Sequence, residues 1–143
     1  LRFIGGRDRV SPDILAMLDD ARATTEGNTG LNLTIAFNYG GQDEIVDAVR
    51  AIAREAKAGT LEPEAIGRET ISQFLHTAGV PDPDLIVRTS GEQRLSNFLI
   101  WQSAYAEFVF TDTLWPEFDR KALIGAIEEF NRRERRYGAG DGA

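Results

Sequence analysis

Two arginines flank a glycine turn in the second half of the chain. Arg88 ends the apolar run 85–87, Gly91 follows three residues later, and Arg94 and Ser96 come next. An arginine side chain presents a fork of N–H donors that matches phosphate oxygens, and glycine lets backbone N–H groups approach a ligand closely. Because ligands of open α/β sheets bind beyond the carboxyl ends of the strands, this spacing predicts an anion site that favours phosphate. The residue types alone leave a second interpretation open, in which both arginines form surface ion pairs worth about 0–1 kcal/mol each.

Other polar residues give weaker signals. Glu107 begins a second apolar run, where a carboxylate could cap the sheet or bind Mg²⁺, which typically takes one or two carboxylates together with substrate phosphates. The stretch 38–41, Asn-Tyr-Gly-Gly, is typical of a turn between a strand and a helix. The basic stretch 132–138 suits the negative end of a helix dipole, although its four arginines could also bind phosphate. The single histidine, His76, lies beside apolar residues, which favours a structural role.

The composition narrows the class of protein. A net charge of −7 argues against nucleic acid as a partner, and the lack of cysteine excludes disulfides and thiolate metal sites. No apolar run approaches the roughly 20 residues that span a bilayer, and no signal peptide is visible, so we expect a cytoplasmic protein. A nucleotide-binding α/β protein is a weak alternative, because the sequence contains neither a P-loop nor a GxGxxG motif.

The elements that must position these residues alternate between strands and helices. Ser11-Pro12-Asp13 combines an N-cap, a first-turn proline and a first-turn acid, which predicts the start of a helix. The alternation predicts an α/β fold with a mainly parallel central sheet flanked by helices, in one domain. The expected strands are 2–5, 31–37, 84–88 and 107–111, and the expected helices are 11–27, 41–59, a weaker one from 63, 98–105 and 119–132.

Helical spacing also predicts which faces of two of these helices are buried. In the helix 41–59, the expected inward residues are Ile45, Val49, Ile52 and Ala56. In the last helix, which Asp119 caps, they are Leu123, Ile127 and Phe130.

Several motifs, taken in order along the chain, closely resemble the cis-prenyltransferases, and most closely the bacterial undecaprenyl diphosphate synthases. The main one runs from Asp84 to Glu107 and reads Arg-Thr-Ser-Gly-Glu, Arg-x-Ser-Asn-Phe, Trp-Gln and Tyr-Ala-Glu. Asn28-Thr-Gly, Asn38-Tyr-Gly-Gly and Leu114-Trp-Pro add to it, so the resemblance covers nearly the whole chain. Gln93 departs from the histidine that some relatives carry.

The resemblance implies an enzyme that condenses isopentenyl diphosphate with an allylic diphosphate to form a Z-polyprenyl diphosphate, the precursor of a lipid carrier for the cell wall. Arg88, Arg94 and Ser96 match the residues that hold the diphosphate of isopentenyl diphosphate. Glu107 matches a carboxylate that handles Mg²⁺, and Leu31 corresponds to the deep end of the tunnel for the growing chain. Further substrate-binding residues, Arg136 and Gly138, match an Arg-x-Gly motif that reaches the partner subunit of a homodimer. The implied location is cytoplasmic, with peripheral association at the inner face of the plasma membrane where the product is delivered.

One family motif is absent from the sequence. The Asp-Gly-Asn-Gly-Arg loop, which in the family binds the allylic diphosphate and carries the essential aspartate, does not occur in the 143 residues. We therefore expect residues 1–143 to be the C-terminal portion of a single cis-prenyltransferase domain that lacks its N-terminal part, and to be inactive alone. A non-catalytic accessory subunit of a heteromeric cis-prenyltransferase is the alternative that the resemblance leaves open.

Overall fold

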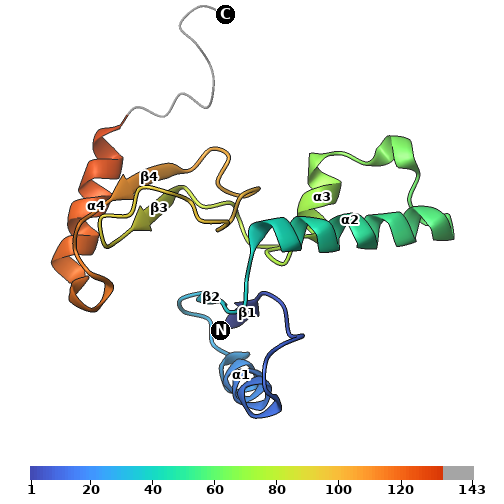
Figure 1. Cartoon of the computed structure of the whole chain (residues 1–143), viewed down its shortest axis with the longest axis horizontal. Coiled ribbons are helices and arrows are strands. Elements are labelled where there is room, and N and C mark those ends of the chain that lie inside the picture. The colour runs from blue at the N-terminus through green and yellow to red at the C-terminus, as the bar shows by residue number, and fades with distance from the viewer. Residues whose placement is uncertain (134–143) are drawn as a thin grey trace, which may run out of the picture. The chain divides into compact units, whose positions relative to one another are not determined.

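The computed structural model describes residues 1–133, and the chain divides into two compact units, Leu1–Pro81 and Asp82–Ala143. Both units combine helices with parallel strands, which confirms the predicted α/β class (Figure 1). Unit 1 contains β1 (Arg2–Ile4), α1 (Pro12–Thr25), β2 (Thr34–Ala36), α2 (Gly41–Ala58), a 3-10 turn (Pro63–Ala65) and α3 (Arg68–Phe74). Unit 2 contains β3 (Leu85–Arg88), β4 (Glu107–Phe110), a 3-10 turn (Trp115–Glu117) and α4 (Arg120–Arg132).

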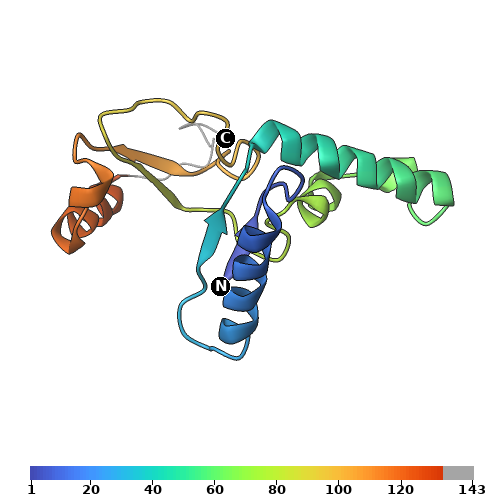
Figure 2. The same ribbon diagram turned by 60° about the horizontal axis from the view of Figure 1, so that its bottom comes forward.

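Unit 1 begins with a strand–helix–strand motif. β1 and β2 pair in parallel, with Arg2 opposite Thr34 and Ile4 opposite Ala36, and α1 packs against β1 (Figure 2). The predicted strand 31–37 shortens to three residues, because β1 offers a partner of only that length. Leu31 therefore lies before β2 and not on it, and its side chain is 87% exposed.

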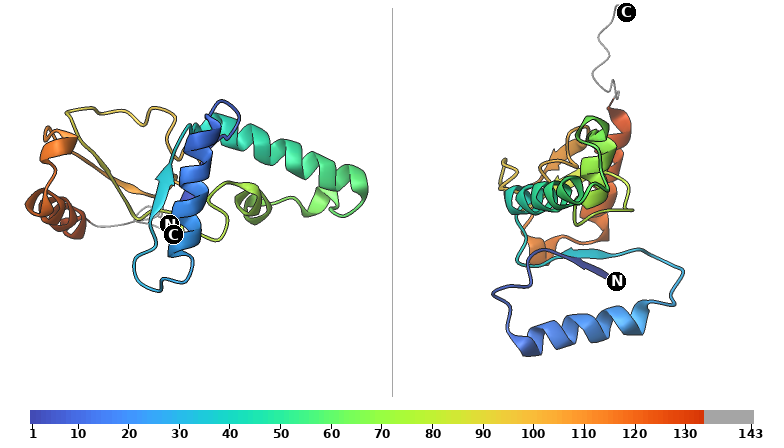
Figure 3. Two further views of the ribbon diagram at one scale, coloured as in Figure 1. Left: turned by 90° about the horizontal axis from the view of Figure 1, so that it is seen from below. Right: turned by 90° about the vertical axis from the view of Figure 1, so that its right-hand side faces the viewer.

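The second half of unit 1 is a pair of helices, α2 and α3, which lie side by side (Figure 3). The predicted inward face of α2 is partly wrong. Ile52 is buried, but Val49 is exposed, and the other buried residues are Gly41, Glu44 and Ala48. The face is rotated because Glu44 finds hydrogen-bond donors in the interior, so a charged residue takes a core position that the apolar pattern assigns to its neighbours.

Unit 2 is built on the parallel pair β3–β4, with Leu85 opposite Glu107 and Arg88 opposite Phe110. The predicted helix 98–105 is wrong, since this stretch forms a series of turns. Ser96, Asn97 and Leu99 have φ values of 50°, 63° and 47°. These left-handed conformations, uncommon for residues with a side chain, prevent a continuous helix from starting here.

Helix α4 packs against β4, as Figure 1 shows. The Oδ1 atom of Asp119 accepts a hydrogen bond of 2.9 Å from the backbone N–H of Ala122, which confirms the predicted cap. The predicted inward face is mostly wrong, because Leu123 and Ile127 are exposed and Ala126 is the buried residue. A small residue at the contact lets the helix approach the sheet closely, while the bulkier Leu123 and Ile127 stay exposed.

Candidate functional site: a pocket lined by two arginines and an aromatic wall

One face of the β3–β4 sheet forms the base of a pocket. In a parallel pair, residues opposite each other point to the same side, and alternate residues point to opposite sides. Ile86 and Arg88 therefore share a face with Phe108 and Phe110, whose rings stack with centroids 6.0 Å apart. The pocket on this face has a volume of about 310 Å³. Its lining residues are Ile86, Val87, Arg88, Thr89, Ser90, Glu92, Arg94, Leu95, Phe98, Phe108 and Phe110.

The turn after β3 is fixed to the chain that follows β4. The backbone N–H of Ser90 donates to the Thr113 carbonyl over 2.9 Å, and that of Gly91 donates to the Thr111 carbonyl over 3.0 Å. Gly91 has a φ of +68°, where glycine is favoured. The turn is thus anchored by two backbone hydrogen bonds, and it carries the chain from Arg88 back toward the pocket at Arg94.

The structure brings Arg88 and Arg94 to the same pocket, but it holds them differently. Arg88 is half-buried at the end of β3, and its Nη1 lies 3.5 Å from the carbonyl oxygen of Leu95. Arg94 is exposed and forms an ion pair with Glu92. Ser96 is exposed in the left-handed region and is not among the residues that line the pocket.

Glu107 lies apart from this pocket. It begins β4, whereas Arg88 ends β3, so the two are separated by three residues of parallel strand, or about 10 Å along the strand direction. They also point to opposite faces of the sheet, because Glu107 is in register with Leu85 and not with Ile86 or Arg88. Unit 2 therefore does not place this carboxylate beside the two arginines.

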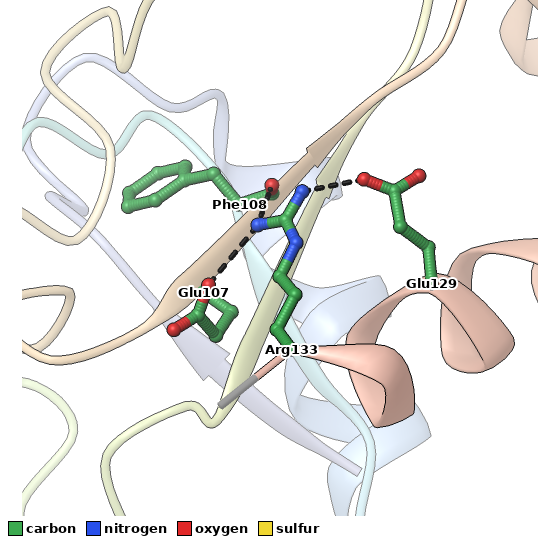
Figure 4. A network of polar contacts seen from close by, with 4 residues as sticks. All are labelled: Glu107, Phe108, Glu129 and Arg133. Atoms are coloured by element: carbon green, nitrogen blue, oxygen red, sulfur yellow. Dashed lines mark hydrogen bonds and ion pairs between the residues drawn. The ribbon is translucent and has the colours of Figure 1, made fainter. Parts of the chain in front are cut away.

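The partner of Glu107 is Arg133, the residue that follows α4 (Figure 4). Nη1 of Arg133 donates to Oε2 of Glu107 over 3.0 Å and to the Phe108 carbonyl over 2.7 Å, and Nη2 donates to Oε1 of Glu129 over 2.5 Å. The hydrogen bonds to Glu107 and Glu129 raise the pKa of Arg133 above its ordinary value. Within residues 1–133 no three histidine or acidic side chains converge on a point that could hold a metal ion.

Unit 1 contains a second and larger cavity, of about 820 Å³. Leu31 and Asn28 contribute to its lining, together with β1 residues and the segment after α3. Apolar residues such as Phe3, Leu33 and Val80 share this lining with arginines 2, 7 and 22. The predicted site residues Arg136 and Gly138 lie outside the described part of the chain.

Two charged residues that are held by hydrogen bonds in the structure could not be recognised from the sequence. Glu44 is 1% exposed and accepts hydrogen bonds from the Tyr39 hydroxyl, over 2.5 Å, and from the His76 backbone N–H, over 2.8 Å. Glu44, Ala48 and Ile52 follow each other at the i, i+4 spacing of one helix face. A glutamate at such a position is normally expected to face solvent, so the spacing did not predict its burial. Arg133 belongs to a basic run, in which nothing distinguishes the arginine that turns back to β4.

Relatives of known sequence place the chain in a family. The family model of undecaprenyl diphosphate synthases matches residues 1–138. The chain is 56% identical to an isoprenyl transferase of Brucella suis and 54% identical to one of Rhizobium meliloti. Each match covers 138 residues, or 96% of this chain, and 54% and 56% of the two relatives. The chain thus spans about half the length of the curated relatives that it matches.

Two solved structures share the fold. Lavandulyl diphosphate synthase from Lavandula x intermedia, in complex with dimethylallyl diphosphate, is 36% identical with a TM-score of 0.93, over 96% of this chain and 59% of that one. A probable undecaprenyl diphosphate synthase from Campylobacter jejuni is 31% identical with a TM-score of 0.80, over 96% and 62%. These similarities confirm the resemblance drawn from the Asp84–Glu107 motifs, and the chain belongs to the undecaprenyl diphosphate synthase family of prenyltransferases.

Proposed function

We propose that the protein is a cis-prenyltransferase that condenses isopentenyl diphosphate with an allylic diphosphate to make a Z-polyprenyl diphosphate. The observation that carries the proposal is the pocket of unit 2, where two arginines and an aromatic wall line one hollow. A diphosphate with a short hydrocarbon chain matches this lining, because its charged group suits the arginines and its hydrocarbon suits the aromatic wall. Family membership supports this assignment, as does the related synthase that was solved with dimethylallyl diphosphate, an allylic diphosphate.

In this proposal, Arg88 and Arg94 bind the diphosphate of isopentenyl diphosphate, and Ser96 assists from the same loop. Guanidinium groups suit this task because they form charge-assisted, forked hydrogen bonds to phosphate oxygens. The five-carbon chain would lie against Phe108 and Phe110, so that its alkene faces the second substrate. The alkene forms a carbon–carbon bond to C1 of the allylic substrate, the bond from C1 to its diphosphate breaks, and a proton leaves the isopentenyl unit.

The growing hydrocarbon requires an apolar cavity. We assign this role to the apolar part of the lining of the unit 1 cavity, which includes Leu31, Leu33 and Phe3. Burial of a hydrocarbon contributes about 25 cal/mol per Å² of apolar surface removed from water, which favours elongation while space lasts. Arg136 and Gly138 complete the proposed set of substrate-binding residues.

Magnesium belongs to the proposal as the cofactor. Mg²⁺ commonly binds one or two carboxylates plus substrate phosphates, so a single carboxylate from this chain is consistent with such a site, although it does not form one alone. Glu107 is the candidate, because Arg133 engages only one of its oxygens among the described residues. When bound, the ion would neutralise negative charge on the departing diphosphate.

The remaining parts of the proposal concern assembly and location. We propose a homodimer that works in the cytoplasm and delivers a lipid-carrier precursor to the inner face of the plasma membrane, without nucleic acid as a partner. Within residues 1–133, no helix has the length and apolarity to cross a bilayer.

The test is the incorporation of labelled isopentenyl diphosphate by the full-length protein, with Mg²⁺ and either geranyl or farnesyl diphosphate. Arg88→Ala and Arg94→Ala should each raise the KM for isopentenyl diphosphate by about 10- to 100-fold, since each loses charge-assisted hydrogen bonds worth about 1.5–3 kcal/mol. Arg120→Ala, an exposed arginine of α4, is the control. An unchanged KM in both pocket variants would refute the assignment of the pocket.

A further inference from the structure

The loop that follows β4 holds the carboxyl end of β3 at three points. The backbone N–H of Thr111 donates to the Arg88 carbonyl over 2.9 Å. The Thr113 carbonyl accepts from the N–H of Ser90 over 2.9 Å, and the Thr111 carbonyl accepts from that of Gly91 over 3.0 Å. The last residue of β3 and the turn after it are therefore both fixed by one short loop.

The turn serves the pocket through its shape. Its N–H groups at Ser90 and Gly91 are bonded to the loop, so they are not free to bind a phosphate. Both residues have a φ of 68°, a conformation that is costly for serine and persists only where the surrounding structure enforces it. This backbone path carries the chain from Arg88 to Arg94, which both line the pocket.

The side chain of Thr111 gives the loop its conformation. Its hydroxyl accepts a hydrogen bond from the backbone N–H of Thr113 over 3.3 Å and donates one to the Thr113 hydroxyl over 3.0 Å. A threonine hydroxyl that bonds the backbone two residues on stabilises a tight turn. Between the two threonines, Oδ1 of Asp112 lies 3.1 Å from the place of a Cβ on Gly91, so loop and turn are closely packed.

We propose that Thr111 is a positioning residue for the pocket: its hydroxyl shapes the loop that holds the turn between Arg88 and Arg94. This inference rests on the proposed function, in which these arginines bind the diphosphate of isopentenyl diphosphate. Thr111 is half-buried and is not among the residues that line the pocket, so it acts through the backbone. Because preorganised groups bind better than groups that must first be ordered, loss of the hydroxyl should weaken substrate binding more than the chemical step.

The first test is the steady-state kinetics of the full-length protein. Thr111→Val keeps the size of the side chain but removes the hydroxyl. It should raise the KM for isopentenyl diphosphate by about 3- to 10-fold, the change expected from one lost hydrogen bond, while kcat stays within about twofold. Thr111→Ser keeps the hydroxyl and should restore the KM.

Two threonine variants are matched controls. Thr113→Val removes the hydroxyl partner but keeps the N–H that bonds to Thr111, so its KM should stay within about twofold of the unmodified protein. Thr60→Val removes a hydroxyl that bonds to the Glu55 carbonyl at the end of α2, in unit 1. It should leave the KM for isopentenyl diphosphate unchanged.

The second test observes the turn itself, without substrate. Amide hydrogen exchange reports the local opening of hydrogen bonds, and the two amides of interest are those of Ser90 and Gly91. Thr111→Val should accelerate their exchange by about 3- to 10-fold, and exchange within α4 should not change. Thr111→Ser should show the exchange of the unmodified protein.

The proposal requires both effects, so a raised KM without faster exchange of the turn would overturn it, as would faster exchange with an unchanged KM. Faster exchange throughout unit 2 with a loss of kcat would also overturn it, because that result indicates a general loss of stability. Circular dichroism establishes folding; if Thr111→Val is unfolded, Thr111→Ala carries both tests with the same criteria.

The proposed function fails separately from this inference. An unmodified protein that does not incorporate isopentenyl diphosphate would count against the proposed function alone. Normal incorporation, with an unchanged KM in Thr111→Val, would count against the role of Thr111 alone.

Discussion

At the scale of residues, the two pocket arginines have different surroundings. Arg88 is half-buried at the end of a paired strand, so little side-chain freedom remains to be lost when a ligand binds. Arg94 is exposed and paired with Glu92, so it must exchange one carboxylate for a phosphate. Preorganised groups contribute more to binding than groups that must first be ordered. Substitution of Arg88 should therefore weaken the binding of isopentenyl diphosphate more than substitution of Arg94.

We expect Arg88→Lys to raise the KM for isopentenyl diphosphate more than Arg94→Lys does. Lysine keeps the charge but lacks the planar fork, and the fixed backbone of β3 cannot shift to compensate at residue 88. The measurement is steady-state kinetics at saturating allylic substrate, with Arg120→Lys as the control. An equal effect of both substitutions, or a larger one at Arg94, would contradict the ranking.

Glu44 gives a residue-scale prediction about stability. Glu44→Ala removes the acceptor that the part-buried Tyr39 hydroxyl and His76 N–H share, and each lost hydrogen bond to a charged group is worth about 1.5–3 kcal/mol. The free energy of unfolding in urea should fall by about 2–5 kcal/mol. Tyr39→Phe should cost less, since it removes only one donor, and Asp43→Ala, an exposed acid in the same turn, serves as the control. A loss below about 1 kcal/mol would show that the buried carboxylate is dispensable.

At the scale of elements, the carboxyl ends of β1 and β2 are joined by a close backbone contact. Gly5 has a φ of +116°, and a Cβ added there would lie 2.0 Å from the carbonyl oxygen of Phe37. The next residue, Gly6, donates its N–H to the Asn38 carbonyl over 3.0 Å and accepts a hydrogen bond from the Asn38 side chain over 2.9 Å. The turn that follows β1 is therefore hydrogen-bonded to the turn that follows β2.

Gly5→Ala should disrupt this junction. The substitution combines a disfavoured φ with overlap against backbone that cannot move without breaking the strand pair, so we expect a loss of about 3 kcal/mol or more. Gly27→Ala is a matched control, because no atom lies within 4 Å of its added Cβ. Urea unfolding of both variants measures the difference, and equal stabilities would show that the junction can rearrange.

At the scale of the whole molecule, the net charge of −7 makes the arginine pocket a local exception in an acidic chain. Binding of a diphosphate to such a protein benefits from a metal ion that lowers the charge of the ligand. In the proposed function, substrate phosphates complete the coordination of an ion held by Glu107, since no three-ligand group occurs within residues 1–133. An ion shared in this way should be easily removed.

We accordingly expect EDTA to abolish incorporation of isopentenyl diphosphate and excess Mg²⁺ to restore it fully. The rapid return of activity on adding Mg²⁺, without refolding, would distinguish a shared substrate–metal complex from a structural ion. The control is circular dichroism in EDTA, which should be unchanged if the ion is shared with substrate and is not structural. Turnover that persists in EDTA would contradict the proposed role of magnesium.

The sequence by itself determined the class of fold and the location of the arginine pocket. Strand and helix signals are local: β-branched runs such as 85–87, the cap at Asp119 and the glycine at 59 act through their immediate neighbours. The ordered motifs between Asp84 and Glu107 were specific enough to identify the family before any geometry was known. Arg88 and Arg94 were found because a strand end and a glycine turn are both visible in the chain.

Only the tertiary structure decided which faces are buried and which charged groups meet. An apolar helical stripe includes Val49, Leu123 and Ile127, yet these side chains are exposed. The residues that are buried instead are Glu44, Ala48 and Ala126. Hydrogen bonds from Tyr39 and His76 make burial of Glu44 favourable, and small residues allow close packing. The separation of Glu107 from Arg88 follows from strand register, and its pairing with Arg133 joins residues 26 positions apart. Such contacts depend on how elements pack, which local propensity does not encode.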